Sequence, residues 1–181
     1  MKLTSLFLGL FSFSMIIVVL GSCQQDHDQN SADVIIYGGT SAGISAGIQS
    51  ARLGKSVIII EPASRLGGLT TGGLGQTDIG NKQVIGGIAR EFYRNIKKYY
   101  ENPGNWTWQS RSTYKDGGQT RSGEDEDAMW TFEPSAALKV YQDMIKNLDI
   151  KIVYNQKLNR TKGVSKIANT IHSISMLSGD T

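Results

Sequence analysis

Residues 33–62, DVIIYGGTSAGISAGIQSARLGKSVIIIEP, decide the fold of this chain. The run Val34–Tyr37 is apolar and partly β-branched, which predicts a parallel strand buried on both faces. A glycine turn and a helix follow, and Ser56–Ile60 predicts a second strand that ends at Glu61. Strand, glycine turn, helix, strand and terminal acid, in this order, form the βαβ unit that holds dinucleotides. The stretch therefore predicts an α/β, Rossmann-like domain with a parallel sheet.

The glycine turn supplies the groups that would bind a pyrophosphate. Backbone N–H groups at the start of a helix point outward and carry partial positive charge, so anions bind there. In a GxGxxG register from Gly38, Thr40 replaces the second glycine, and its hydroxyl group can donate a hydrogen bond to a phosphate instead. We expect Glu61 to accept hydrogen bonds from a ribose. The predicted pyrophosphate contacts are Gly38, Gly39, Thr40, Ser41, Ala42 and Gly43.

Small residues along the predicted helix allow a second explanation of these glycines. They could serve only to bring the helix close to the sheet. The small residues are Ala42, Gly43, Ala46, Gly47 and Ala51. Packing alone requires neither Gly38-Gly39 before the helix nor Glu61 after the next strand. The pattern therefore favours nucleotide binding.

The first 22 residues predict a secretion signal. Lys2 supplies a positive charge, residues 6–20 are largely apolar, and Leu20-Gly-Ser-Cys23 follows. This end resembles the bacterial lipobox, where cleavage before the cysteine precedes attachment of diacylglyceryl and palmitate groups. A transmembrane anchor, the alternative, needs about 20 apolar residues. We expect residues 1–22 to be removed, Cys23 to be lipidated at the bacterial cell envelope, periplasmic or outer-membrane face, and 23–32 to form a flexible tether.

Composition narrows the chemistry of the remaining chain, residues 33–181. Cys23 is the only cysteine, so this part contains no disulfide, thiolate metal site or cysteine nucleophile, and we predict no metal site. The net charge of +3 is too small to argue for nucleic acid. The acidic run Glu124–Asp127 could bind a cation, but a solvated surface is favoured. His172 could be an acid or base, although we expect it to be packed within a strand.

Residues 65–75, RLGGLTTGGLG, bear on which dinucleotide is bound. Their glycine pairs let the backbone wrap closely round a ligand, and Arg65 can bring a positive charge to a phosphate. A mobile surface loop is the alternative. The stretch resembles the RxGG element of flavoproteins with two dinucleotide-binding domains. With residues 37–43 and Trp130–Pro134, it is similar to a bacterial family of FAD-dependent oxidoreductases whose secreted members are often lipoproteins.

The resemblance implies a noncovalently bound FAD and a small-molecule substrate, which could be carbohydrate-derived. The residues that would line the path towards the flavin are Arg65, Gly67, Gly68, Leu69 and Thr70. A diffusible nicotinamide cofactor would be lost outside the cytoplasm, so an NAD-dependent reductase is the least favoured alternative. A surface lipoprotein that binds glycans through its tryptophans is another. Those residues are Trp106, Trp108 and Trp130, although packing beneath a loop is favoured for the first two.

The rest of the chain predicts two helices, a strand and a hairpin. Apolar residues at helical spacing between 85 and 99 predict a helix ended by Asn102-Pro-Gly104, and a long loop covers 103–128. A second helix begins at Pro134, and Ile150–Tyr154 extends the parallel sheet. Ile167–Leu177 predicts a hairpin or β-meander arm, with a turn at Gly179-Asp180.

Compared with the flavoproteins that it resembles, the chain corresponds to the N-terminal portion of such a protein. The resemblance implies a later strand and a substrate domain that these 181 residues do not contain, and no catalytic acid or base is recognisable. We therefore expect a fold that is incomplete at its C-terminus. The expected behaviour of this portion alone is weak FAD binding without turnover.

Overall fold

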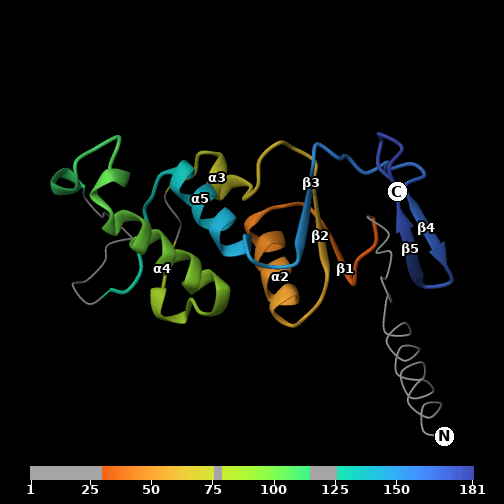
Figure 1. Cartoon of the computed structure of the whole chain (residues 1–181), viewed down its shortest axis with the longest axis horizontal. Helices are drawn as coiled ribbons and strands as arrows, with labels where there is room; N and C mark the ends of the chain where they lie inside the picture. The colour runs from red at the N-terminus through yellow and green to blue at the C-terminus, as the bar shows by residue number, and fades with distance from the viewer. Residues whose placement is uncertain (1–29, 76–78, 115–125) are drawn as a thin grey trace, which may run out of the picture.

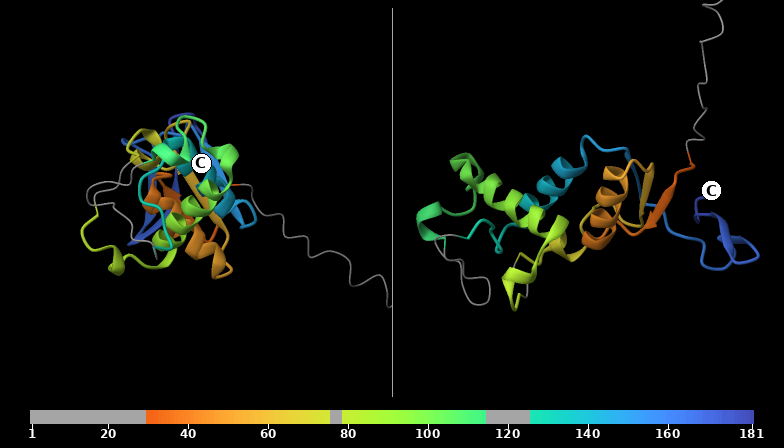
Figure 2. Two further views of the ribbon diagram at one scale, coloured as in Figure 1. Left: turned by 90° about the vertical axis from the view of Figure 1, so that its left-hand side faces the viewer. Right: turned by 90° about the horizontal axis from the view of Figure 1, so that it is seen from below.

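The computed structural model describes residues 30–75, 79–114 and 126–181. The predicted signal, Cys23 and most of the tether lie outside this range, as do Glu124 and Asp125 of the acidic run. The elements form an elongated series, from helix α4 (Gly87–Glu101) at one end to a β-hairpin at the other (Figures 1 and 2). Within the described residues, no helix has the length and apolar character needed to span a membrane.

A parallel three-stranded sheet occupies the middle of the molecule. Its strands are β1 (Val34–Tyr37), β2 (Val57–Glu61) and β3 (Ile150–Tyr154), in the order β1-β2-β3. All five residues of β2 are buried, which explains its unbroken apolar run before Glu61. The predicted α/β fold is confirmed, with β2 beginning one residue later than expected.

Burial of β1 on both faces was a wrong expectation. Ile35 and Tyr37 are 44% and 45% exposed, whereas Val34 and Ile36 pack against the helices. β1 is an edge strand, and only one face of the sheet is fully covered. Its apolar run therefore does not indicate burial on both sides.

Helix α2 (Ser41–Arg52) covers one face of the sheet, and two further helices pack beyond it. Helix α2 packs directly on the strands, whereas helix α5 (Pro134–Ile145) and α4 pack against α2 and against each other (Figure 1). Pro134 stands in the first turn of α5, and α4 ends at Glu101, directly before Asn102-Pro-Gly104, both as predicted. The shared core includes Ile44, Ile48, Ile59, Leu66, Phe92, Ile96, Val140 and Tyr141. Short helical turns complete the chain: α3 (Leu69–Gly72), η1 (Lys82–Val84), η2 (Pro103–Asn105) and η3 (Arg111–Thr113).

A separate hairpin lies against the open face of the sheet. Strands β4 (Val164–Ile167) and β5 (Thr170–Ile174) are antiparallel, with an irregularity between Ser165 and Lys166. Met176 packs on Ile58 and Ile60 of β2. The hairpin begins earlier than predicted, and its turn is at residues 168–169. The hairpin turn predicted at Gly179-Asp180 is wrong: these residues form a separate turn after β5, where the Met176 N–H donates to the Asp180 carbonyl oxygen at 2.8 Å.

Close approach of α2 to the sheet depends on one glycine in its first turn. A Cβ atom at Gly43 would overlap the carbonyl oxygen of Gly38, which belongs to the backbone and cannot rotate away. Gly47 similarly faces Ile59, whereas Ala42 and Ala46, also expected against the sheet, are exposed. The buried stripe of α2 is therefore Gly43, Ile44, Gly47 and Ile48.

Gly43→Ala should lower the free energy of unfolding by about 3 kcal/mol, because the added methyl group overpacks a backbone junction. Gly72→Ala is the control, since a Cβ there meets open space and the residue has no positive φ. Urea denaturation of both variants gives the comparison. Equal stability of the two variants would contradict the packing argument.

Candidate functional site

The turn between β1 and α2 presents the N-terminus of a 12-residue helix to solvent. Gly38 has a φ of +109°, a conformation that favours glycine, and its N–H donates to the Ile60 carbonyl oxygen at 2.8 Å. Thr40 is the N-cap, and its hydroxyl oxygen accepts from the Gly43 N–H at 3.2 Å. The first turn of α2 carries no acid, so its partial positive charge is not offset there.

Glu61 joins the end of β2 to this turn. Its side chain is buried, with the residue 8% exposed. One carboxylate oxygen accepts from the Gly39 N–H at 2.7 Å, and the other accepts from the Ala63 N–H at 2.7 Å. Each oxygen has a second lone pair, so a ribose hydroxyl could still donate to it. The ribose contact stays a prediction. The observed bonds show that Glu61 also joins Gly39 and Ala63, which its distance from the glycine turn in the sequence did not indicate.

We call residues 65–75 the strap and residues 38–43 the glycine turn. Gly67 and Gly68 of the strap lie against Gly39 and Thr40 of the turn. The Gly67 N–H donates to the Gly39 carbonyl oxygen at 2.7 Å, and buried Leu66 leaves no room for a side chain at Gly39. Gly67 and Gly68 have positive φ values of +95° and +54°. This part of the strap is therefore held by backbone bonding and core packing, which argues against a loose surface loop.

Hydroxyl groups of α2, of the strap and of α5 lie close together at this junction. The Ser41 hydroxyl donates to the Gly67 carbonyl oxygen at 3.1 Å and lies 2.7 Å from the Thr70 hydroxyl. Tyr141 of α5 is the third member: burial raises the pKa of its phenol, while interactions with Ser41 and Thr70 lower it. Tyr141 is not among the site residues predicted from the sequence. Helical spacing gives no signal for a contact between chain segments this far apart.

The outer residues of the predicted site are exposed. Arg65 reaches the start of α5, where its guanidinium donates to the Pro134 carbonyl oxygen at 3.4 Å. Thr40, Gly68 and Leu69 are also exposed. The structure thus brings all the predicted cofactor contacts, from Gly38 to Gly43 and from Glu61 to Thr70, to one end of the parallel strands. This is the edge at which α/β folds bind ligands.

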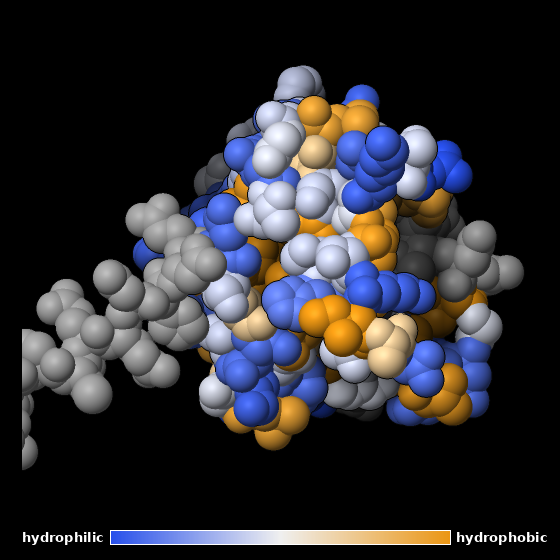
Figure 3. Space-filling view, turned by 90° about the vertical axis from the view of Figure 1, so that its right-hand side faces the viewer, coloured by the Kyte–Doolittle hydropathy of each residue, from blue (hydrophilic) through white to orange (hydrophobic). Residues whose placement is uncertain are grey.

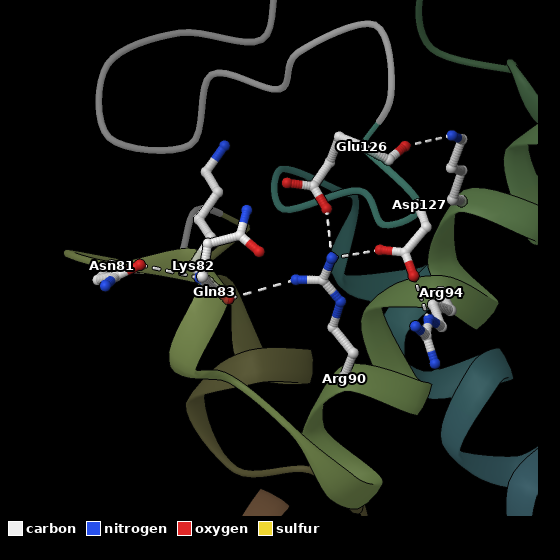
Figure 4. Close-up of polar contacts among 8 residues, drawn as sticks. Asn81, Lys82, Gln83, Arg90, Arg94, Glu126 and Asp127 are labelled. Carbon is white, nitrogen blue, oxygen red and sulfur yellow. Dashed lines mark hydrogen bonds and ion pairs between the residues drawn. The ribbon is translucent and has the colours of Figure 1, made fainter.

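The two described residues of the acidic run, Glu126 and Asp127, are paired with arginines. Asp127 is exposed, as expected for a solvated surface, whereas the expectation is wrong for Glu126. Glu126 has a side chain only 8% exposed and bonds Arg90 at 2.7 Å. Asp127 bonds both Arg90 and Arg94, as Figure 4 shows. These arginines hold the pKa of Asp127 below its usual value, the hydrogen bond from Arg94 contributing most. Glu126 and Asp127 therefore hold the loop that precedes α5 against α4.

The three tryptophans do not form one exposed platform, so the glycan-binding alternative loses its basis. Trp130 is 0% exposed, and the Arg90 guanidinium lies 5.2 Å from its ring centroid. Trp106 packs against Tyr100 and Tyr114, and its indole N–H donates to the Tyr100 carbonyl oxygen at 2.8 Å. Only Trp108, 83% exposed, faces solvent among the three, so packing beneath a loop was correct for Trp106 and wrong for Trp108.

His172 lies in β5, as expected for a late strand, but its side chain is exposed and not packed. Thr170 and Ile171, which precede it in the strand, are exposed as well, because the hairpin tip projects away from the sheet. Among the described residues, no group of three or more His, Cys, Asp or Glu side chains could hold a metal ion.

Residues 33–180 match the profile of a protein family described as FAD dependent oxidoreductase. No curated protein matches the chain. Solved structures that resemble it include an L-amino acid deaminase from Proteus vulgaris, with 14% sequence identity and a TM-score of 0.48 over 83% of this chain and 50% of that one. Another is L-proline dehydrogenase from P. horikoshii, with 15% identity and a TM-score of 0.45, covering 83% and 50%.

A flavin monooxygenase variant from Stenotrophomonas maltophilia has 16% identity and a TM-score of 0.42, covering 83% of this chain and 34% of that one. The chain therefore spans between about a third and a half of the length of these three structures.

Glu61→Ala should lower the free energy of unfolding by about 1 to 3 kcal/mol without any ligand, because the buried Gly39 N–H loses its acceptor. Glu61→Gln should also be destabilising, since its NH2 group must face one of the two N–H donors. Glu101→Gln, at an exposed helix end, is the matched control. Denaturant titration measures all three, and wild-type stability of Glu61→Ala would show that the junction does not depend on the carboxylate.

Proposed function

The chain belongs to the FAD dependent oxidoreductase family, and from this premise we propose that residues 33–181 form the FAD-binding part of a lipid-anchored oxidoreductase. FAD is the cofactor of the family, and noncovalent binding is proposed for this chain. The observation that supports the proposal most is the junction of the glycine turn, Glu61 and the strap. Three segments meet there around the positive end of α2.

The residues at this junction fit a dinucleotide. A pyrophosphate needs N–H and hydroxyl donors, and the turn offers both at exposed positions, through Thr40 and Ala42 at the start of α2. Glu61 would accept from the adenosine ribose with its remaining lone pairs. Arg65, Gly67, Gly68, Leu69 and Thr70 would line the direction of the flavin. Close backbone approach at this point agrees with the positive φ values of Gly67 and Gly68.

In the proposed reaction a hydride passes from a reduced small-molecule substrate, and bound FAD supplies the chemistry that accepts it. The residues of this chain would bind and orient the cofactor, and the strap would exclude water from its phosphate end. A carbohydrate-derived substrate is part of the proposal. No described residue is assigned as a catalytic acid or base, because the activity is proposed for the whole protein.

The lipid anchor is the second part of the proposal. It is supported by the Leu20-Gly-Ser-Cys23 sequence and by the polar stretch that separates it from β1. Cleavage before Cys23 and acylation of its thiol would hold the domain at the bacterial envelope. A tightly bound FAD would stay with the protein in that compartment.

Ala42→Asp should separate stability from cofactor binding. A carboxylate in the first turn of α2 favours the helix by about 0.3 to 1 kcal/mol, so stability should not fall. The same charge repels a pyrophosphate, and FAD affinity should fall by about tenfold or more. Ala46→Asp, one turn further along the exposed side, is the control and should retain FAD affinity.

Flavin fluorescence during titration of the purified chain measures these affinities, and thermal unfolding with and without FAD gives a second readout. A chain that neither binds FAD nor gains stability from it would overturn the proposed cofactor function. Equal affinity of the two aspartate variants would overturn the proposed place of the pyrophosphate.

Cys23→Ser should abolish acylation, because serine offers no thiol to the lipid-transferring enzyme. In a bacterial host fed labelled palmitate, the wild-type chain should incorporate label and lose its first 22 residues. Ser22→Ala, which keeps a small residue beside Cys23, should still be labelled. Label on Cys23→Ser, or none on the wild type, would overturn the anchor but leave the FAD proposal standing.

A further inference from the structure

Large apolar side chains are exposed along residues 155–181, which we call the hairpin segment. At the tip of the hairpin, Ile167 and Ile171 are 65% and 58% exposed. Val164 and Leu177 are exposed as well. Figure 3 views this end of the molecule and shows hydrophobic and hydrophilic side chains side by side. Since the described residues leave these isoleucines exposed, the two side chains add little to the stability of this part of the protein.

The hairpin segment is also strongly basic. It contains four cationic side chains and one carboxylate, a net charge of +3 with histidine neutral. The cations are Lys157, Arg160, Lys162 and Lys166, all exposed. None of them takes part in the salt bridges found among the described residues. Asp180 is occupied locally, since its carboxylate accepts from Gln156 at 2.7 Å and from Ser178 at 2.8 Å.

This segment lies beside the point where the chain leaves the predicted tether. Asn30 and Ser31 line the same groove as Ile174 and Met176 of the hairpin segment and Ile58 of β2. Six residues lie between Cys23 and Asn30. An anchor at Cys23 would therefore hold the hairpin segment close to a lipid surface.

We propose that the hairpin segment is a membrane-docking surface that binds anionic phospholipid bilayers. Exposed Ile167 and Ile171 would enter the headgroup boundary, and the surrounding cations would bind lipid phosphates. A second copy of the chain is the less favourable occupant, because two segments that each carry +3 repel one another. The docking contacts themselves need no acyl group, so they are independent of the proposed lipidation.

Cell-free synthesis provides the test, because the full chain made in this way carries no lipid on Cys23. Sedimentation compares vesicles of phosphatidylcholine with vesicles of phosphatidylcholine and phosphatidylglycerol. The chain should bind the anionic vesicles more tightly by about tenfold or more, and high salt should remove the preference. Lys2 and the apolar residues 6–20 are common to every variant, so they do not produce differences between variants.

Two double variants locate the contact. Lys162→Gln with Lys166→Gln should weaken binding to anionic vesicles by about tenfold. Ile167→Ser with Ile171→Ser should weaken it by a similar factor of about ten. The control, Lys98→Gln with Arg111→Gln, removes the same charge at the α4 end of the molecule and should change binding by less than about twofold.

Equal binding to both vesicle types would overturn the proposal. So would an equal loss in the control variant, which would indicate attraction by overall charge. A dimer that dissociates on Ile167→Ser with Ile171→Ser, without preference for anionic vesicles, would assign the surface to a second copy instead. Labelling with palmitate tests the anchor separately, so failure of docking and failure of lipidation give different results.

Discussion

The hydrogen bond from the Gly39 N–H to the Glu61 carboxylate connects the parts of this domain that are needed at its candidate site. It joins the turn after β1 to the end of β2, and the Gly39 carbonyl oxygen in turn accepts from Gly67 of the strap. The two strand ends and the strap are thus held through one residue without a side chain. Because Glu61 is buried and accepts a second bond from Ala63, its position depends little on solvent.

The same arrangement explains why the small residues of α2 differ in importance. Gly43 and Gly47 face the sheet and allow the helix to approach, whereas Ala42 and Ala46 face outward. The approach brings the N-terminus of α2 under the strap, where Ser41 meets Thr70 and Tyr141. Helix packing and the candidate cofactor site are therefore two results of one contact between α2 and the sheet.

Local patterns predicted the regular elements well. β1, β3 and the start of α5 at Pro134 were placed correctly, because an apolar run or a proline at a helix start is a property of neighbouring residues. Contacts between distant segments could not be predicted in this way. The position of Tyr141 near Ser41 is one example, and the ion pair between Glu126 and Arg90 is another. Both depend on packing between segments that are far apart in the sequence. The hairpin began earlier than expected because an irregularity at Ser165 and Lys166 breaks the alternation of side chains.

The strand order has a consequence for how the domain assembles in time. β1 pairs with β2 across a single helical crossover, whereas β3 pairs with β2 only after the chain has passed from Glu61 to Ile150. Closing the longer loop costs more chain entropy, so the first pairing is the faster event. During synthesis the βαβ unit can form on the ribosome while β3 is still untranslated. The sheet edge that later receives β3 then stays open, and a chaperone that covers it would act during that interval.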